Sequence, residues 1–185
     1  MPVYIAMLRG INVGGHNPVR MNRLQELFSR LGFEQVRTYI QSGNVVFKAA
    51  KRSAADLSKA IEKEILREFG FAVAVFCRSS AEMADVIQRN PLAKRKGVDR
   101  ARLHVSFLAE VPAEAAVKKL AGFAADGEQL RNDGRELYLY CPDGYGNSKL
   151  ANTNVERVLK VAATTRNWTT VNTLYEMSLV NPETE

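Results

Sequence analysis

Residues 36–47, VRTYIQSGNVVF, decide the fold of this chain. They hold two short runs of β-branched and aromatic residues on either side of a Ser-Gly-Asn turn at 42–44. This is the pattern of a β-hairpin, in which two neighbouring strands are joined by a tight turn. The segments before and after the hairpin then decide which fold it belongs to.

Both neighbouring segments have helical periodicity. Apolar residues three and four positions apart predict one helix over 22–31, ahead of the hairpin, and another over 54–69, behind it. Apolar runs at 3–8 and 71–77 predict one strand before the first helix and one after the second. The first part of the chain therefore has the order βαββαβ, which is the ferredoxin-like pattern.

Two helices have a capping box at their expected start. Asn22 and Gln25 form one such pair, and Ser79 and Glu82 form another at the start of a third helix. The Asn-Pro pair at 90–91 ends this third helix, because proline disfavours a helical residue before it.

A basic stretch follows the third helix. Residues 89–102, RNPLAKRKGVDRAR, hold six basic side chains, one acidic side chain and no helical period. A solvated linker is the default interpretation of such a run, and contact with nucleic acid is the other. We place the boundary between the halves here, with one domain over 1–90 and the other over 100–185.

The second half repeats the theme of the first. A strand at 102–110, a helix near Pro112 and two strands at 128–131 and 136–141 are followed by two helices. This order is a βαββα variant with a C-terminal helix, and Gly-rich loops after strands are expected at matching places in both halves. The fold class is therefore α+β, with two packed α+β subdomains of which the first is ferredoxin-like.

Composition limits the class of protein. The chain has 185 residues, of which 46% are hydrophobic and 25% charged, as in globular proteins. It shows no secretory signal and no apolar run of membrane-spanning length, so we expect no membrane association and a cytoplasmic location. Cys77 and Cys141 lie far apart in apolar strand-like runs and are expected to be buried free thiols.

The net charge of +6 is unevenly distributed. Residues 1–100 hold 17 Lys and Arg against 9 Asp and Glu, whereas residues 101–185 hold 9 against 11. The basic first half could face an anionic ligand or a polyanion, although basic surfaces also serve solubility.

The stretch LRGINVGGHN at 8–17 is the first candidate for ligand contact. Its glycines let backbone amides point at an anion, and Arg9, Asn12 and Arg20 would add side-chain donors. It matches neither G-x-G-x-x-G nor a Walker loop, so a turn from strand to helix is the competing interpretation. The candidate ligand-binding residues here are Arg9, Gly10, Asn12, Gly14 and Gly15.

Two later stretches are candidates as well. In CPDGYGNSKL at 141–150, glycines would allow close approach to an anion, while Ser148 could instead cap the next helix. In TTRNWTTV at 164–171, Trp168 is expected in the core, and the polar pair before it suits a ligand, an ion pair or a cap. The candidate residues are Gly144, Gly146, Ser148, Lys149, Arg166 and Asn167.

Signals for catalysis are weak. His16 and His104 are the two histidines of the chain, and there is no HExxH, no metal-ligand spacing and no G-x-S-x-G motif. We therefore predict no metal site, and His16 is a candidate for acid–base chemistry because it lies in a Gly-rich loop. Cofactor, catalytic residues and oligomeric state are unknown from the sequence.

The chain resembles a bacterial family of unknown function, DUF1697. The resemblance rests on LRGINVGG, TYIQSGNVVF, NPL at 90–92, LYLYCPDGYGNSKL and TTRNW, in this order along nearly the whole chain. Asn147 stands where the family would be expected to have a basic residue, which removes one charge from the supposed anion site. The resemblance implies two α+β subdomains and a cytosolic protein, and it implies no activity or substrate.

Three functions stay open at this point. The first is a binding module for an anionic or phosphorylated small ligand, such as a nucleotide, with the three candidate stretches converging between the subdomains. The second is RNA binding through the basic N-terminal half, with Tyr4, Tyr39 and Phe47 stacking on bases. The third is an enzyme of unknown reaction class that uses His16 or the Ser148-Lys149 pair.

Overall fold

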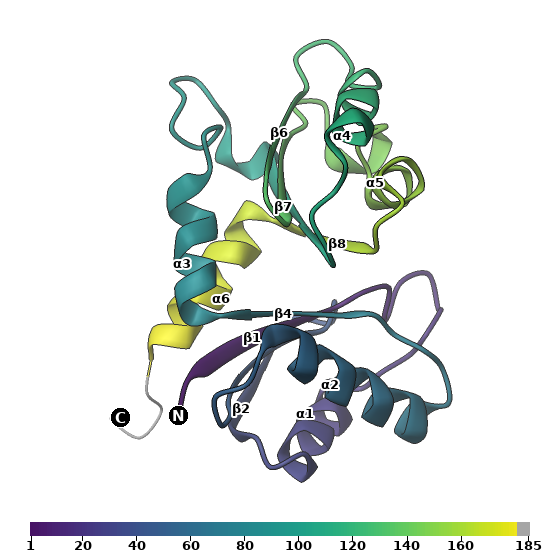
Figure 1. Cartoon of the computed structure of the whole chain (residues 1–185), viewed down its shortest axis with the longest axis vertical. Coiled ribbons are helices and arrows are strands. Elements are labelled where there is room, and N and C mark those ends of the chain that lie inside the picture. The colour runs from purple at the N-terminus through teal and green to yellow at the C-terminus, as the bar shows by residue number, and fades with distance from the viewer. Residues whose placement is uncertain (181–185) are drawn as a thin grey trace. The chain divides into compact units, whose positions relative to one another are not determined.

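The structure, a computed structural model, describes residues 1–180. The chain divides into two compact units (Figure 1). The first unit holds Met1–Asp85 and, from Thr173 on, the last part of the described chain; the second is the continuous segment Val86–Asn172. The domain limits expected from the sequence, 1–90 and 100–185, stay a prediction.

The first unit is a four-stranded antiparallel sheet with two helices on one face (Figure 1). The strand order β2-β3-β1-β4 is that of a ferredoxin-like fold, as predicted from the hairpin outward. Its elements are β1 (Val3–Leu8), α1 (Met21–Arg30), β2 (Glu34–Tyr39), β3 (Asn44–Lys48), α2 (Ala54–Phe69) and β4 (Val75–Ser79), followed by α3 (Ser80–Arg89).

The core of the first unit lies between the sheet and these two helices. Leu24, Leu27 and Phe28 of α1 are fully buried, because their spacing puts them on one side of the helix. On α2, the buried residues on one side of the helix are Leu57, Ile61 and Ile65. The helix predicted over 54–69 is therefore confirmed, and Gly70 ends it with a φ of 78°.

The second unit has the same topology. Its sheet has the order β6-β7-β5-β8, again with all strands antiparallel. Its elements are β5 (Leu103–Leu108), α4 (Glu114–Ala121), β6 (Gln129–Asp133), β7 (Glu136–Tyr140), α5 (Asn152–Leu159) and β8 (Ala163–Asn167), followed by α6 (Trp168–Leu179) and with two 3₁₀ turns, Arg100–Arg102 and Tyr145–Asn147. The predicted α+β class with two subdomains, the first of them ferredoxin-like, is thus confirmed, and the second subdomain has the ferredoxin-like strand order as well.

Strand β8 is the element that the sequence did not reveal. The expected second half was βαββα, whereas the structure has βαββαβ followed by α6. The residues of β8, ATTRN, are mostly polar and pass directly into the helix that begins at Trp168. Without apolar alternation the strand gives no sequence signal, and pairing with β5 alone defines it.

Helix starts agree with the predictions at one capping box and differ at the other. Ser79 and Glu82 exchange the two expected hydrogen bonds at the start of α3, with N···O distances of 2.8 and 3.1 Å. The predicted Asn22 cap of α1 is wrong, because the N-cap residue is Arg20 and makes no side-chain cap. Gln25 instead donates to the carbonyl of Val36 on β2.

The two Gly-rich loops do not occupy matching places, which corrects our expectation. The loop at 9–20 follows β1 in the first unit, but its counterpart after β5 spans only 109–113. The long loop of the second unit, 141–151, follows β7, which corresponds to β3. Because neighbouring strands are antiparallel, these loops leave opposite ends of the common fold.

Candidate functional site

The loop at 9–20 has an unusual backbone. Gly10, Gly14 and Gly15 have φ values of 66°, 56° and 78°, and Asn12 and Asn17 have 54° and 48°. Glycine adopts this left-handed region freely, and asparagine tolerates it better than most residues. The loop therefore needs these residue types for its course, independently of any ligand.

Asn12 holds the loop against the start of α1. Its amide group accepts from the Val19 N–H and donates to the Val19 and Gln41 carbonyls, each at 2.8 Å. The sequence places Gly15 too far ahead of α1 for the helix end to act on the loop. These hydrogen bonds show that the loop folds back, so that Asn12 lies next to the start of α1.

A groove of about 430 Å³ lies beside this loop. We call it the α1 groove; it is lined by Asn12, Pro18, Val19, Arg20, Arg23, Gln41 and Phe69. All of these residues belong to the first unit. The volume lies within the range typical of small-molecule sites, which is about 300–1,000 Å³.

The groove lies at the N-terminal end of α1. Arg20 is the N-cap of α1 and Arg23 lies in its first turn, where no side chain caps the helix and no acidic residue is present. The first amides of a helix lack intrahelical partners and carry the positive end of the helix dipole. The guanidinium of Arg20 makes no hydrogen bond or ion pair with the described residues and is exposed.

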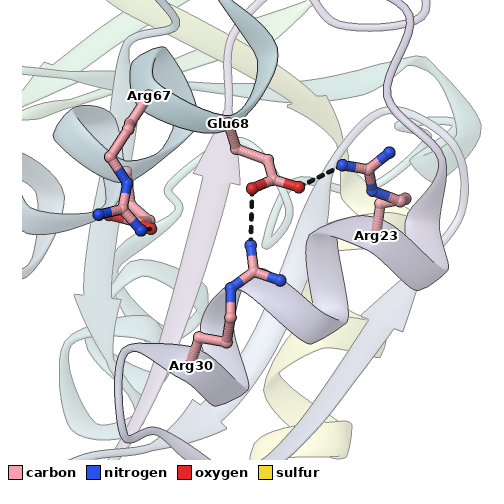
Figure 2. A network of polar contacts seen from close by, with 5 residues as sticks. Arg23, Arg30, Arg67 and Glu68 are labelled. Atoms are coloured by element: carbon pink, nitrogen blue, oxygen red, sulfur yellow. Dashed lines mark hydrogen bonds and ion pairs between the residues drawn. The ribbon is translucent and has the colours of Figure 1, made fainter.

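Arg23 is held in place by an ion-pair network between the two helices (Figure 2). Glu68 of α2 accepts hydrogen bonds from Arg23 and from Arg30, the latter at 2.9 Å. The hydrogen bond from Arg23 is the main cause that keeps the pKa of the Glu68 carboxyl below its ordinary value. One carboxylate faces two guanidinium groups, so the network keeps a net positive charge beside the groove.

The turn that presents Gln41 is strained. Ile40 has a φ of 50° and its side chain is 49% exposed, although a β-branched residue rarely adopts the left-handed region. Such strain persists only where the surroundings impose it, and it is common at functional sites. The Gln41 carbonyl next to it is the acceptor of the Asn12 amide.

The predicted residues of the first loop are only partly in the groove. Asn12 lines it, whereas Gly10, Gly14 and Gly15 are exposed elsewhere on the loop, and Arg9 is half-buried with its N–H on the Ala74 carbonyl. Arg23 and Phe69 were missed, because they meet only after α1 and α2 pack together and no spacing signals that contact.

The loop at 141–151 in the second unit is largely bonded to itself. The Ser148 hydroxyl accepts from the Leu150 N–H, so it does not cap α5, which begins at Asn152. Gly144 has a φ of 104°, and a Cβ added there would lie 3.6 Å from a guanidinium nitrogen of Arg102. Gly146 and Lys149 are exposed on this loop.

Tyr145 of the same loop stacks on His104 of β5. The ring centroids lie 4.5 Å apart with an interplanar angle of 19°. Burial is the main cause that raises the pKa of Tyr145 and lowers that of His104, so both rings are neutral near pH 7.

Arg166 and Asn167 have structural roles. Arg166 is buried and donates to the Thr164 hydroxyl at 2.8 Å and to the Thr165 carbonyl at 3.0 Å, and its burial lowers its pKa to about 10. Asn167 caps α6 by accepting from the Thr170 N–H. Trp168 is buried, as predicted, together with Val171 and Leu174.

The residues expected to stack on RNA are largely internal. Tyr4 and Phe47 are buried in the core of the first unit and stack on each other. They are therefore not available to bases, while Tyr39 is half-buried on β2. His16 is exposed on its loop and does not line the α1 groove.

No helix in residues 1–180 is both long and apolar enough to span a bilayer. Within the same residues, no three His, Cys, Asp or Glu side chains gather as a metal site would need. Cys77 and Cys141 are buried and free.

Comparison with known families assigns the chain to one of them. A family model described as a protein of unknown function, DUF1697, matches residues 1–138. The chain belongs to the DUF1697 family. The match covers the N-terminal segment of the first unit, Met1–Asp85, and continues through the second unit as far as Tyr138 in β7.

A solved structure supports the fold of this DUF1697 protein. The conserved bacterial protein SP0830 from Streptococcus pneumoniae is similar to it with a TM-score of 0.74 and 24% sequence identity. The alignment covers 96% of this chain and 98% of that protein. No curated protein matches the chain.

Proposed function

We propose that the first unit of this DUF1697 protein binds a small anionic ligand, such as a phosphorylated compound, in the α1 groove. The supporting observation is that the unpaired guanidinium of Arg20 borders the same groove as the uncapped first turn of α1. Free helix amides together with an exposed cation form a common anion-binding arrangement.

The proposal narrows the site expected from the sequence. Asn12 has a positioning role in it, because its amide is fully used in holding Val19 and Gln41. Arg20 and Arg23 supply the positive charge instead of Arg9. Gly144, Gly146, Ser148 and Lys149 belong to the other unit and are not needed for it.

Calorimetric titration with inorganic phosphate and ribose 5-phosphate tests this function. We expect Arg20→Gln to weaken binding of either compound at least tenfold, because a charge-assisted hydrogen bond is lost. Arg52→Gln removes the same charge from an exposed position of the same unit outside the groove and serves as the control. Equal affinities of the two variants would contradict the proposed site.

A further inference from the structure

We propose that the ligand of the α1 groove carries a flat ring that stacks on the guanidinium of Arg23. The ligand class is then a ring-bearing organic anion, for which a mononucleotide is the model compound. This inference rests on the proposed function and adds the part of the ligand that the anion site does not contact.

Two aromatic rings and one guanidinium group lie at or near the groove. Phe71 and Phe69 stack with a centroid distance of 6.1 Å and an interplanar angle of 28°. The guanidinium carbon of Arg23 lies over the Phe69 ring, 5.7 Å from its centroid. Arg23 is thus a third planar group near the two aromatic rings, and both it and Phe69 line the groove.

The network in Figure 2 fixes the orientation of this third group. Arg23 uses one edge of its guanidinium to reach Glu68, which Arg30 holds from the other side. Hydrogen bonds of a guanidinium lie in its plane, so edge-on pairing leaves its faces open for stacking. The guanidinium carbon lies over the Phe69 ring, and the side chain is still 51% exposed, which leaves surface for a ligand ring.

The size and walls of the groove agree with a ligand larger than a bare anion. A volume of about 430 Å³ is many times the roughly 30 Å³ of one water molecule and suits an organic molecule. Pro18 and Val19 add an apolar wall. The side-chain amide of Gln41 makes no hydrogen bond with the described residues, so it is free to pair with polar atoms at a ring edge.

The test compares three probes on the full-length chain by calorimetry: adenosine 5′-monophosphate, ribose 5-phosphate and inorganic phosphate. We expect the nucleotide to bind about tenfold more tightly than ribose 5-phosphate, which is within the range of one base–side-chain stack. Arg23→Lys keeps the positive charge and loses the planar group. It should remove most of the difference between the two compounds and leave the affinity for ribose 5-phosphate within about twofold.

The matched variant Arg20→Lys should keep the preference for the nucleotide, because Arg20 acts on the anionic group. If Arg23→Lys fails to fold, Phe69→Leu replaces it, since this change removes the ring behind Arg23 and keeps the Glu68 pair. The ratio of the two affinities is a readout that a purely structural effect on stability would not change.

The outcomes separate this inference from the proposed function. Equal binding of the nucleotide and ribose 5-phosphate to the unmodified protein, or an unchanged ratio in Arg23→Lys and Phe69→Leu, would overturn the stacking and leave anion binding intact. Absence of binding by all three probes would overturn both.

Discussion

At the scale of single residues, Gly43 in the β2–β3 turn is the glycine at which an added Cβ would be most crowded. Its φ is 83°, and a Cβ added there would lie 2.6 Å from Cδ1 of Ile11, whose side chain is buried. Gly43→Ala should lower the free energy of unfolding by about 3 kcal/mol, from backbone strain and overpacking together. Gly32→Ala, with a φ of 80° and open space, should cost only about 1 kcal/mol. Urea titration measures both, and equal losses would contradict the crowding at Gly43.

His104 links stability to pH. Burial lowers its pKa in the folded state, so the folded protein takes up this proton less readily than the unfolded chain, whose value is about 6.5. The contribution of the neutral His104 ring to the free energy of unfolding is fully present above about pH 6.5. It is lost as the pH falls through the lowered pKa of His104 in the folded state. In urea titrations between pH 7.5 and 4.5, His104→Phe should lose less stability than the unmodified protein. Parallel curves would show that His104 does not contribute.

At the scale of elements, each sheet has an edge strand whose first backbone amide donates to a carboxylate on a helix. β4 and β8 are edge strands. The Val75 N–H at the start of β4 donates to Glu62 of α2 at 2.8 Å, and the Ala163 N–H at the start of β8 donates to Glu156 of α5 at 2.9 Å. An unpaired strand edge invites pairing with other chains, and each of these side chains occupies one amide at such an edge.

Removing one of these carboxylates should expose one strand only. Glu62→Ala should speed hydrogen exchange of the Val75 amide and lower the free energy of unfolding by about 1–2 kcal/mol, because a half-buried donor is left without a partner. Glu156→Ala should have the same effect at Ala163 and leave Val75 protected. Glu62→Gln keeps an acceptor and should preserve most of the protection. Faster exchange at both strands in either variant would contradict the separate roles.

The sequence predicts elements well where an apolar stripe and a helix stop coincide, as in α2 with Gly70. It does not predict β8, whose polar residues have a strand conformation only because β5 pairs with them. In the candidate site, Asn12 and Arg20 could be named from the sequence because they lie in the Gly-rich loop at 9–20. The contact of Arg23 with Phe69 joins two helices, and a single sequence carries no signal for such tertiary packing.

At the scale of the whole molecule, the first unit contains residues from both ends of the chain. Arg37 on β2 donates to the Met177 carbonyl of α6 at 2.5 Å, and the hydroxyls of Ser80 and Ser178 are 2.7 Å apart. The second unit is one continuous segment. Residues of α6 therefore stabilise the sheet of the first unit, although they lie far from its strands in the sequence.

A variant truncated after Asn172 should have a destabilised first unit, because it lacks the residues of α6 that Arg37 and Ser80 contact. Burial raises the pKa of Cys77 to about 12 and also raises that of Cys141, so both thiols should be unreactive in the intact protein. After truncation, Cys77 should react with a thiol reagent while Cys141 stays protected, with the full-length chain as control. Mass spectrometry identifies the labelled residue, and labelling of Cys141 first would contradict this assignment.

The same arrangement has a consequence during synthesis on the ribosome. The strands of the first sheet emerge early, but the Met177 carbonyl that Arg37 binds emerges 140 residues after Arg37. The continuous second unit emerges in full before them. On the nascent chain, the first unit can thus be completed only after the whole second unit has been translated.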